Sequence, residues 1–266
     1  MRIFITGSTG ILGRHVCDFI KKYKPDAQVF RNTVDIMDSK SVLDLVASVG
    51  SIDLVIHLAA LVPIAQVKEA PEKAYEVNVG GTINLLNALI GQDAKFIYCS
   101  TGHVYSSSTD QICEDTPANP LSLYGRTKRI GEIIATDVAD ARGFPLCIPR
   151  VFSIHDPQQS GSFLRPNLER RFAEEDLTKP FELFGAHSTR DFLTAREAAR
   201  RLVLLAFSDA CGPVNVASGT GTLISDFAQS LSPVPLKIIP LGEPDIMVAD
   251  IKRLQKYLGK NLLLGE

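Results

Sequence analysis

The fold of this chain is decided by its first turn, which reads Arg2-Ile3-Phe4-Ile5-Thr6-Gly7-Ser8-Thr9-Gly10-Ile11-Leu12-Gly13. The apolar residues 3–5 predict a short buried strand, and the amphipathic stretch 11–23 that follows predicts a helix. A strand, a glycine-rich turn and a helix in this order form a device that binds phosphates.

Each of the three glycines has its own role in such a turn. Gly7 permits the tight turn, Gly10 lets the backbone approach a pyrophosphate, and Gly13 lets the helix pack close to the strand. The free N–H groups of the helix and the positive end of its dipole then face the phosphates. The turn therefore predicts a dinucleotide site, and we expect these residues to contact the cofactor: Gly7, Thr9, Gly10, Ile11 and Leu12.

The composition narrows the remaining possibilities. A chain of 266 residues can build one large domain or a domain with a small lobe, and a hydrophobic share of 45% suits a packed core. A net charge of −2 argues against nucleic acid and anionic membranes as partners, and no apolar run could span a bilayer. Five scattered cysteines without a CxxC pair predict neither disulfides nor a metal site. Because the first strand leaves no room for a signal peptide, we expect a cytoplasmic protein.

Strand and helix patterns alternate along the first half of the chain. Predicted strands cover residues 28–31, 52–58, 95–99 and 145–148, and predicted helices cover residues 39–49, 71–90 and 121–141. Alternation of this kind predicts an α/β fold with a doubly wound parallel sheet of the Rossmann type.

The texture of the sequence changes after about residue 150. Proline, glycine and short apolar pieces dominate through residue 185, and further helices are expected at residues 195–207, 223–231 and 250–258. We therefore predict a dinucleotide-binding domain, residues 1–150, and a smaller α/β substrate lobe, residues 151–266, that is interleaved with it.

A second motif, Tyr124-Gly-Arg-Thr-Lys128, predicts acid–base chemistry. Residues at positions i and i+4 share one face of a helix, so the lysine cation should lower the pKa of the phenol and make Tyr124 a usable general acid or base. A surface Tyr–Lys pair at helical spacing is the alternative. The strand before it ends in Ser100-Thr101, at the sheet edge where ligands bind, and Thr101 could hydrogen-bond a substrate oxygen. Ordinary turn chemistry would also explain these two hydroxyls.

Further motifs resemble, in order and over nearly the whole length, the nucleotide-sugar epimerase/dehydratase branch of the extended short-chain dehydrogenase/reductase superfamily. After the glycine turn, the matching motifs are His57-Leu58-Ala59-Ala60, Asn78-Val79-Gly80-Gly81-Thr82, Ser100-Thr101 with Val104-Tyr105, Tyr124 with Lys128, Pro149-Arg150-Val151-Phe152, Gly185 with Arg190-Asp191-Phe192, Gly212 with Asn215-Val216, and Leu258-Gly259.

The resemblance implies roles for particular residues of this chain. Thr101, Tyr124 and Lys128 would form the catalytic triad, with Lys128 also holding the nicotinamide ribose. The cofactor crevice would be lined by Leu58, Ala59, Ala60 and Asn78. The substrate, a nucleotide sugar, would meet Val62, Thr101, Gly102, His103, Val151 and Arg190, with Arg190 at its diphosphate. Relatives commonly dimerise through the helices that start near Pro71 and Pro120, so a homodimer is expected.

The second strand indicates which dinucleotide is bound. Ordinary members of the family end this strand with an acidic residue on the adenosine ribose, but here it ends in Arg31, which suits a 2′-phosphate. The region also resembles that of the NADPH-dependent GDP-fucose synthases, where Asp38 would lie near the adenine. We expect NADP; in the alternative, Asp35 binds the ribose of NAD.

The residues after Thr101 bear on the reaction. The 4,6-dehydratases of the family carry Asp-Glu there, whereas this chain has Gly102-His103, which argues against dehydration. His103 could move a proton beside a ketone, or only hydrogen-bond the substrate. A structural role is expected for His57, and His155 and His187 are expected to be loop residues.

Four functions stay open on the sequence. We favour the NADPH-dependent reduction of a 4-keto, 6-deoxy nucleotide sugar, with Tyr124 as the proton donor. The alternatives are a nucleotide-sugar epimerase with tightly bound NAD, a reductase of a non-sugar carbonyl, and a cofactor-sensing protein without catalysis. The family usually carries a glycine where this chain has Asp156, so the loop that meets the sugar is expected to follow a different path.

Overall fold

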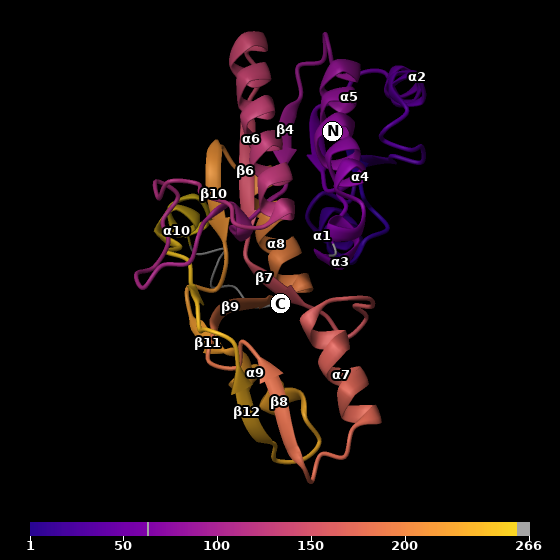
Figure 1. Ribbon diagram of the computed structural model, residues 1–266. Helices are drawn as coiled ribbons and strands as arrows, with labels where there is room; N and C mark the ends of the chain where they lie inside the picture. Colours follow the sequence, from indigo (N-terminus) through magenta and orange to yellow (C-terminus); the bar gives the residue numbers. More distant parts are fainter. Residues whose placement is uncertain (63, 260–266) are drawn as a thin grey trace.

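The computed structural model describes residues 1–62 and 64–259 of the chain. Its centre is a parallel sheet in the strand order β10-β6-β4-β3-β1-β2, with β5 pairing alongside β6 (Figure 1). These strands are β1 (Arg2–Thr6), β2 (Gln28–Arg31), β3 (Leu54–His57), β4 (Lys95–Tyr98), β5 (Ser100–Thr101), β6 (Leu146–Val151) and β10 (Gly212–Val216). The prediction of a doubly wound parallel sheet is confirmed.

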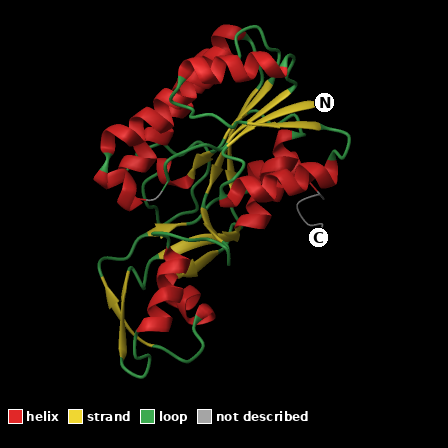
Figure 2. Ribbon diagram, turned by 90° about the vertical axis from the view of Figure 1, so that its right-hand side faces the viewer, coloured by secondary structure: helices red, strands yellow, loops and turns green. Residues whose placement is uncertain are grey.

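Helices cover both faces of this sheet, as Figure 2 shows. Side chains that alternate along a strand point to opposite faces. Ile3 and Ile5 therefore pack in one core, beneath α1 (Ile11–Tyr23), α8 (Ala195–Ala206) and α10 (Lys252–Leu258). Phe4 packs in the other core, beneath α2 (Ser39–Val49), α5 (Gly81–Ala88) and α6 (Leu123–Arg142).

The helix predicted over residues 71–90 is interrupted. It consists of α4 (Pro71–Tyr75), one π-helical turn η1 (Glu76–Gly80) and α5, preceded by α3 (Ile64–Glu69). A π turn accommodates an extra residue in a continuous helix and often marks a functional site. The proline start signal and glycine stop signal on which the prediction rested do not reveal such an insertion.

A smaller lobe lies below the sheet in Figure 1. One mixed sheet contains β7 (Ser153–His155), β9 (Thr189–Thr194), β11 (Gly221–Leu223) and β13 (Ile246–Met247); a pair contains β8 (Pro180–Phe184) and β12 (Lys237–Leu241); and the helices are α7 (Leu164–Glu174) and α9 (Ile224–Leu231). The chain leaves the large sheet after β6 and returns to it with α8 and β10. It then enters the lobe again, from β11 to β13, and returns with α10.

Helix α7 was missed by the sequence analysis. Among its residues only Leu168 is fully buried, so the apolar stripe that reveals a helix is weak. Ion pairs at i,i+4 spacing support it instead, and they join Arg165 to Glu169, Arg170 to Glu174 and Arg171 to Glu175. The strands of the lobe were missed as well: β7, β11 and β13 have only two or three residues, too few to display a period, whereas β8, β9 and β12 have five or six.

Two negative findings apply to the part of the chain that the structure describes. Within residues 1–62 and 64–259, no helix has the length and apolar character needed to cross a membrane. The same residues contain no group of three or more His, Cys, Asp or Glu side chains arranged to hold a metal ion.

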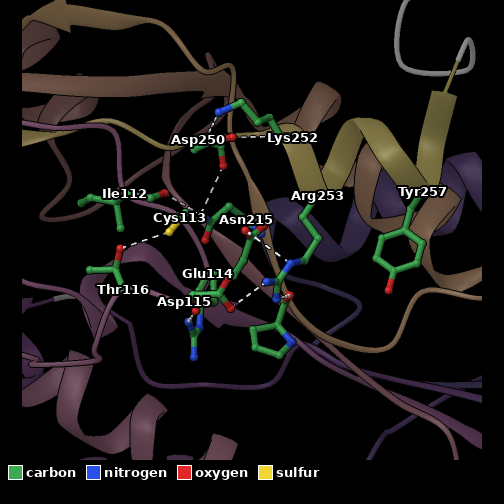
Figure 3. Close-up of polar contacts among 12 residues, drawn as sticks. Ile112, Cys113, Glu114, Asp115, Thr116, Asn215, Asp250, Lys252, Arg253 and Tyr257 are labelled. Carbon is green, nitrogen blue, oxygen red and sulfur yellow. Dashed lines mark hydrogen bonds and ion pairs between the residues drawn. The ribbon is translucent and has the colours of Figure 1, made fainter.

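The last helix fastens the loop that precedes α6 to the sheet (Figure 3). Arg253 donates to the Asp115 carboxylate at 2.8 Å and to the carbonyl of Pro213 at 3.2 Å, and it lies 3.6 Å from the Glu114 carboxylate. Glu114 is buried and accepts the backbone N–H of Asn215 at 2.8 Å. Arg253 thus supplies the cation for a carboxylate that water hardly reaches.

We expect Arg253→Met to lower the free energy of unfolding by about 1–3 kcal/mol, because a buried carboxylate loses its cation. Lys252→Met is the matched control, since Lys252 pairs with Asp250 at the exposed surface, and we expect a change below about 0.5 kcal/mol. Urea denaturation of the three proteins measures both values. Equal losses in the two variants would contradict this account of the clamp.

Candidate active site

The glycine turn after β1 is closed by contacts within the protein. Gly7 has φ +68°, and a Cβ there would lie 2.6 Å from the backbone nitrogen of Ala59. A Cβ on Gly13 would lie 2.2 Å from the carbonyl oxygen of Gly7. Both glycines are therefore required for the close approach of α1 to the ends of β1 and β3.

Gly10 differs from its two neighbours in the motif. A Cβ there would meet only the carbonyl oxygen of Gly7, at 3.4 Å, so the protein's own packing does not demand glycine. Gly10 is the N-cap of α1, no side chain caps it, and the first helical turn holds no acidic residue. Thr9 is exposed on the turn, and Ile11 and Leu12 are half-buried. Free backbone donors beside an open backbone fit the diphosphate of a dinucleotide.

Buried hydrogen bonds order the neighbouring strand end. Thr6 Oγ1 accepts the N–H of Ala59 at 3.1 Å and lies 2.7 Å from His57 Nδ1. His57 Nε2 lies 2.9 Å from Thr82 Oγ1, which itself donates to the carbonyl of Asn78. Because the Thr82 hydroxyl donates its hydrogen to Asn78, His57 must donate to Thr82 through Nε2–H and accept from Thr6 at Nδ1. Burial lowers the pKa of His57 to about 3, so its ring is neutral and serves the architecture.

Asn78, which we predicted to bind cofactor, uses its amide within the protein. It accepts the N–H of Leu61 at 2.7 Å and donates to the carbonyl of Leu61 and to Thr127 Oγ1, both at 3.0 Å. Thr127 in turn donates to the carbonyl of Tyr124 at 2.8 Å. Asn78 therefore ties the segment after β3, where the predicted residues Leu58, Ala59, Ala60 and Val62 are all half-buried, to the helix that bears Tyr124.

Helix α6 lies directly against the end of β4. Ser122 caps it by accepting the N–H of Gly125 at 3.0 Å. A Cβ on Gly125 would lie 2.1 Å from the carbonyl oxygen of His103, and one on Gly131 would lie 1.9 Å from the Tyr98 hydroxyl. These two glycines let the helix approach closely enough for Tyr124 to reach the site.

The structure brings the three predicted catalytic side chains together from β5 and α6. Thr101 ends β5, and its hydroxyl accepts the N–H of His103 at 3.2 Å, at the start of the 3₁₀ turn η2 (Gly102–Val104). The Thr101 hydroxyl also faces the phenol of Tyr124 and acts to lower its pKa. Lys128 follows one helical turn later and is buried.

We expected the Lys128 cation to lower the pKa of the Tyr124 phenol, and this prediction is wrong. Burial raises the pKa of Tyr124 well above its ordinary value, Cys99 raises it further, and the Thr101 hydroxyl acts to lower it. The Lys128 ammonium lies instead over the ring of Tyr98, 4.1 Å from its centroid. Helical spacing correctly placed Tyr124 and Lys128 on one face of the helix. It did not reveal that the Lys128 ammonium would form a cation–π contact with Tyr98.

Two residues of this site were missed by the sequence analysis. Tyr98 holds the Lys128 ammonium against its ring. Burial lowers the pKa of Lys128 to about 8, and Cys99 acts to raise it. Both residues directly precede Ser100 on the strand that was predicted to end at the site. Their position on this strand could have identified them as site residues.

The predicted adenosine end of the cofactor site lies at the end of β2. Arg31 is exposed there and lies beside the thiol of Cys17. Asp38 caps α2 by accepting the N–H of Ser41 at 3.1 Å and its hydroxyl at 2.6 Å. Asp35 accepts the N–H of Met37 at 3.0 Å and so closes its own turn.

His103 and Arg190 meet on the substrate side. The ring of His103 is open to solvent on one side and packs edge-on against Tyr124, with 6.2 Å between centroids. The protein that surrounds the rest of the ring lowers its pKa, as does Arg190, whereas Asp245 raises it. Arg190 donates to both oxygens of Asp245, at 2.7 and 3.0 Å. Asp245 was not predicted, because it lies far along the chain from Arg190.

The other predicted substrate residues lie around η2 and β6. Val151 is buried in β6, and a Cβ on Gly102 would lie 3.0 Å from the ring of Phe152. His187 is exposed between β8 and β9, as expected for a loop residue. His155, expected in a loop, instead ends β7 and accepts a hydrogen bond from Arg165 at 3.3 Å.

Asp156 stands where the family usually carries a glycine, and its side chain stabilises the turn of this loop. Asp156 accepts the N–H of Gln158 at 2.8 Å, which forms a tight turn. Its other oxygen lies 2.8 Å from His15 Nε2 on α1. The loop that follows β7 is thus tied to the helix that begins at the glycine turn.

Comparisons with known proteins agree with this geometry. Residues 3–217 match the model of the NAD dependent epimerase/dehydratase family. A Bacillus subtilis protein described as an uncharacterized UDP-glucose epimerase is 26% identical over 72% of this chain and 68% of its own. The GDP-6-deoxy-D-mannose reductase of Pseudomonas aeruginosa is 27% identical over 88% of this chain and 80% of its own. The structure of RMD from Pseudomonas aeruginosa with NADPH shares the fold, with a TM-score of 0.86, 24% identity, and 97% and 92% of the two chains covered.

The two glycines of the turn should respond differently to alanine. We expect Gly10→Ala to fold with nearly unchanged stability but to bind dinucleotide at least about tenfold more weakly, because its methyl group occupies space left for the ligand. Gly13→Ala should lose stability as well, because the methyl group overlaps the backbone of Gly7. Thermal unfolding with and without cofactor, together with titration calorimetry, separates the two effects. Undiminished affinity in a folded Gly10→Ala variant would refute the assignment.

Proposed function

The chain belongs to the NAD dependent epimerase/dehydratase family, and we propose that within this family it reduces the 4-keto group of a 6-deoxy nucleotide sugar with NADPH. The observation that carries the proposal is the state of Tyr124. Burial raises the pKa of its phenol and keeps it protonated, and the Thr101 hydroxyl faces it from the neighbouring strand. A protonated phenol is the form needed to give a proton to the alkoxide that reduction creates.

The roles of the chain's residues follow from these contacts. The bound nicotinamide would supply the hydride. Tyr124 donates its proton to the substrate oxygen, and Thr101 orients that oxygen and the phenol through its hydroxyl. The ammonium of Lys128 lies over the ring of Tyr98, one helical turn from Tyr124. The family resemblance adds a contact of Lys128 with the nicotinamide ribose.

The choice of NADPH rests on the end of β2. Arg31 is an exposed cation there, whereas the nearby carboxylates of Asp35 and Asp38 are engaged by Met37 and Ser41. A guanidinium beside the adenosine ribose suits a 2′-phosphate better than two hydroxyl groups. The orphan donors at the N-terminus of α1 would bind the diphosphate bridge.

The choice of a keto sugar rests on the residues after Thr101. Gly102 and His103 replace the carboxylate pair that elimination of water requires, so dehydration is not supported. The family resemblance assigns Arg190 to the substrate diphosphate, and in this structure its guanidinium pairs with Asp245. His103 lies beside Tyr124, where the sugar would bind. The relative from Pseudomonas aeruginosa named GDP-6-deoxy-D-mannose reductase is consistent with this substrate class.

A homodimer is part of the same proposal. Helix α5 exposes Ile83 and helix α6 exposes Ile133, two large apolar side chains on neighbouring helices. These are the helices through which relatives commonly pair. Sedimentation equilibrium measures the mass in solution.

Epimerisation is the second candidate, and relatives named as UDP-glucose epimerases favour it. In that reaction Tyr124 must first accept a proton from a sugar hydroxyl, and the cofactor remains bound as NAD. The two functions therefore differ in whether NADPH is consumed.

We expect the purified protein to oxidise NADPH when a 4-keto-6-deoxy nucleotide sugar is added. In Tyr124→Phe the rate should fall by about 10²–10⁴, the usual contribution of a general acid, while cofactor affinity is kept. Absorbance of the reduced nicotinamide follows the reaction. Tightly co-purifying NAD without net NADPH consumption would exclude the reductase and favour the epimerase.

Arg31→Ala tests the cofactor assignment separately. Loss of a charged hydrogen-bond donor to a phosphate should weaken NADPH binding about 10- to 100-fold and leave NADH binding unchanged. Lys40→Ala is the matched control, since it removes an exposed cation from nearby α2. If Arg31→Ala keeps its preference between the two cofactors, the phosphate-binding role is wrong.

A further inference from the structure

A buried ion cluster lies directly behind the proposed catalytic residues. Glu132 on α6 is fully buried, and both of its carboxylate oxygens are engaged. One oxygen accepts from the Ser100 hydroxyl at 2.6 Å and from Arg150 Nε at 2.9 Å. The other accepts from Arg150 at 2.8 Å and from Arg129 at 2.9 Å. Neither Glu132 nor Arg150 has a role in the hydride chemistry itself.

The cluster joins the two elements that carry the catalytic groups. Glu132 follows Lys128 by one turn and Tyr124 by two, so all three lie on one stripe of α6. Ser100 directly precedes Thr101 in β5, and its backbone pairs with Arg150 in β6. The hydrogen bond from Ser100 to Glu132 therefore fixes where Thr101 lies along the helix.

Arg150 also forms hydrogen bonds on the side of its guanidinium that faces away from Glu132. Its remaining terminal nitrogen donates to the Tyr105 hydroxyl at 2.6 Å, and that hydroxyl donates to the side-chain oxygen of Asn215 at 3.0 Å. Tyr105 follows η2, and Asn215 belongs to β10. The guanidinium therefore contacts α6 and the segment after η2 directly, and it reaches β10 through the Tyr105 hydroxyl.

We propose that Glu132 is a positioning residue for the reaction, which holds Thr101 in place against Tyr124 and Lys128 through Ser100 and Arg150. The reaction that Glu132 would assist is the one given under the proposed function, so this proposal rests on that function. The negative charge of Glu132 has a second consequence, because it raises the pKa of Lys128, which burial lowers.

A purely structural role does not account for the ions. Replacing a buried ion pair by apolar side chains of similar volume is often neutral or stabilising, so a core does not need one for stability. An ion pair does offer direction, because a bidentate guanidinium–carboxylate contact has one geometry. Apolar packing could supply neither this fixed position of Ser100 and Thr101 nor the negative charge beside Lys128.

Ser100→Ala tests the positional link without disturbing the ion pair. We expect kcat to fall about five- to tenfold, the equivalent of one hydrogen bond, with the KM values for sugar and NADPH within twofold. Thr136→Ala is the matched control, because Thr136 donates only to the backbone carbonyl of Glu132. Unchanged kcat in Ser100→Ala, or an equal loss in Thr136→Ala, would overturn the proposal.

Glu132→Gln tests the effect of charge on Lys128. Loss of the carboxylate leaves Arg129 and Arg150 uncompensated, so the pKa of Lys128 should fall below its value of about 8. The alkaline limb of the kcat/KM profile should then move to lower pH. If this variant does not fold, the double variant Glu132→Met with Arg150→Met removes both charges at similar volume. A folded variant with an unmoved limb and normal kcat would overturn the proposal.

Nuclear magnetic resonance of the Lys128 side chain keeps this test independent of the reaction. Titration of the ¹³Cε signal in the protein without ligands should give a lower pKa in Glu132→Gln than in the wild type. If the wild type does not oxidise NADPH, the proposed function fails while the titration still tests Glu132. If the titration midpoints agree, the influence of Glu132 on Lys128 fails whatever the reaction is.

Discussion

The close approach of backbone to backbone at the glycine turn is the constraint on which the structure depends. Helix α1 can begin beside the end of β1 only because Gly7 and Gly13 lack side chains. That approach places the free N–H groups of α1 at the carboxyl edge of the parallel sheet. The ends of β3, β4 and β6 open at the same edge, which is where Thr101 and the helix that carries Tyr124 and Lys128 lie.

Polar contacts organise this edge, whereas apolar contacts organise the rest of the sheet. Both faces are covered by apolar side chains. At the edge, Thr6, His57, Thr82 and Asn78 form a buried chain of hydrogen bonds, and Glu132 and Arg150 form a buried ion pair. Buried polar groups are costly unless they are satisfied, and satisfied networks are directional. The strand ends beside the glycine turn and helix α6 are thus held in fixed relation to each other.

The sequence predicted the parts of the site that depend on local spacing. The strand, turn and helix at residues 2–23 and the Tyr124–Lys128 pair follow from periods that a few residues reveal. It missed contacts between distant residues, such as Arg190 with Asp245, because no local pattern connects them. It also missed α7, which is supported by ion pairs in place of an apolar stripe, and the π turn that holds Asn78.

The sequence by itself determined the class of fold and the kind of chemistry, since alternating elements, a glycine-rich turn and a Tyr–Lys spacing are properties of short segments. Only the tertiary structure decided the state of the reacting groups. The protonation of Tyr124, the placement of the Lys128 ammonium on Tyr98 and the carboxylate of Glu132 behind it all depend on burial and on partners brought from other strands. Burial and charge act through space, so the order of residues along the chain does not specify them until the chain has folded.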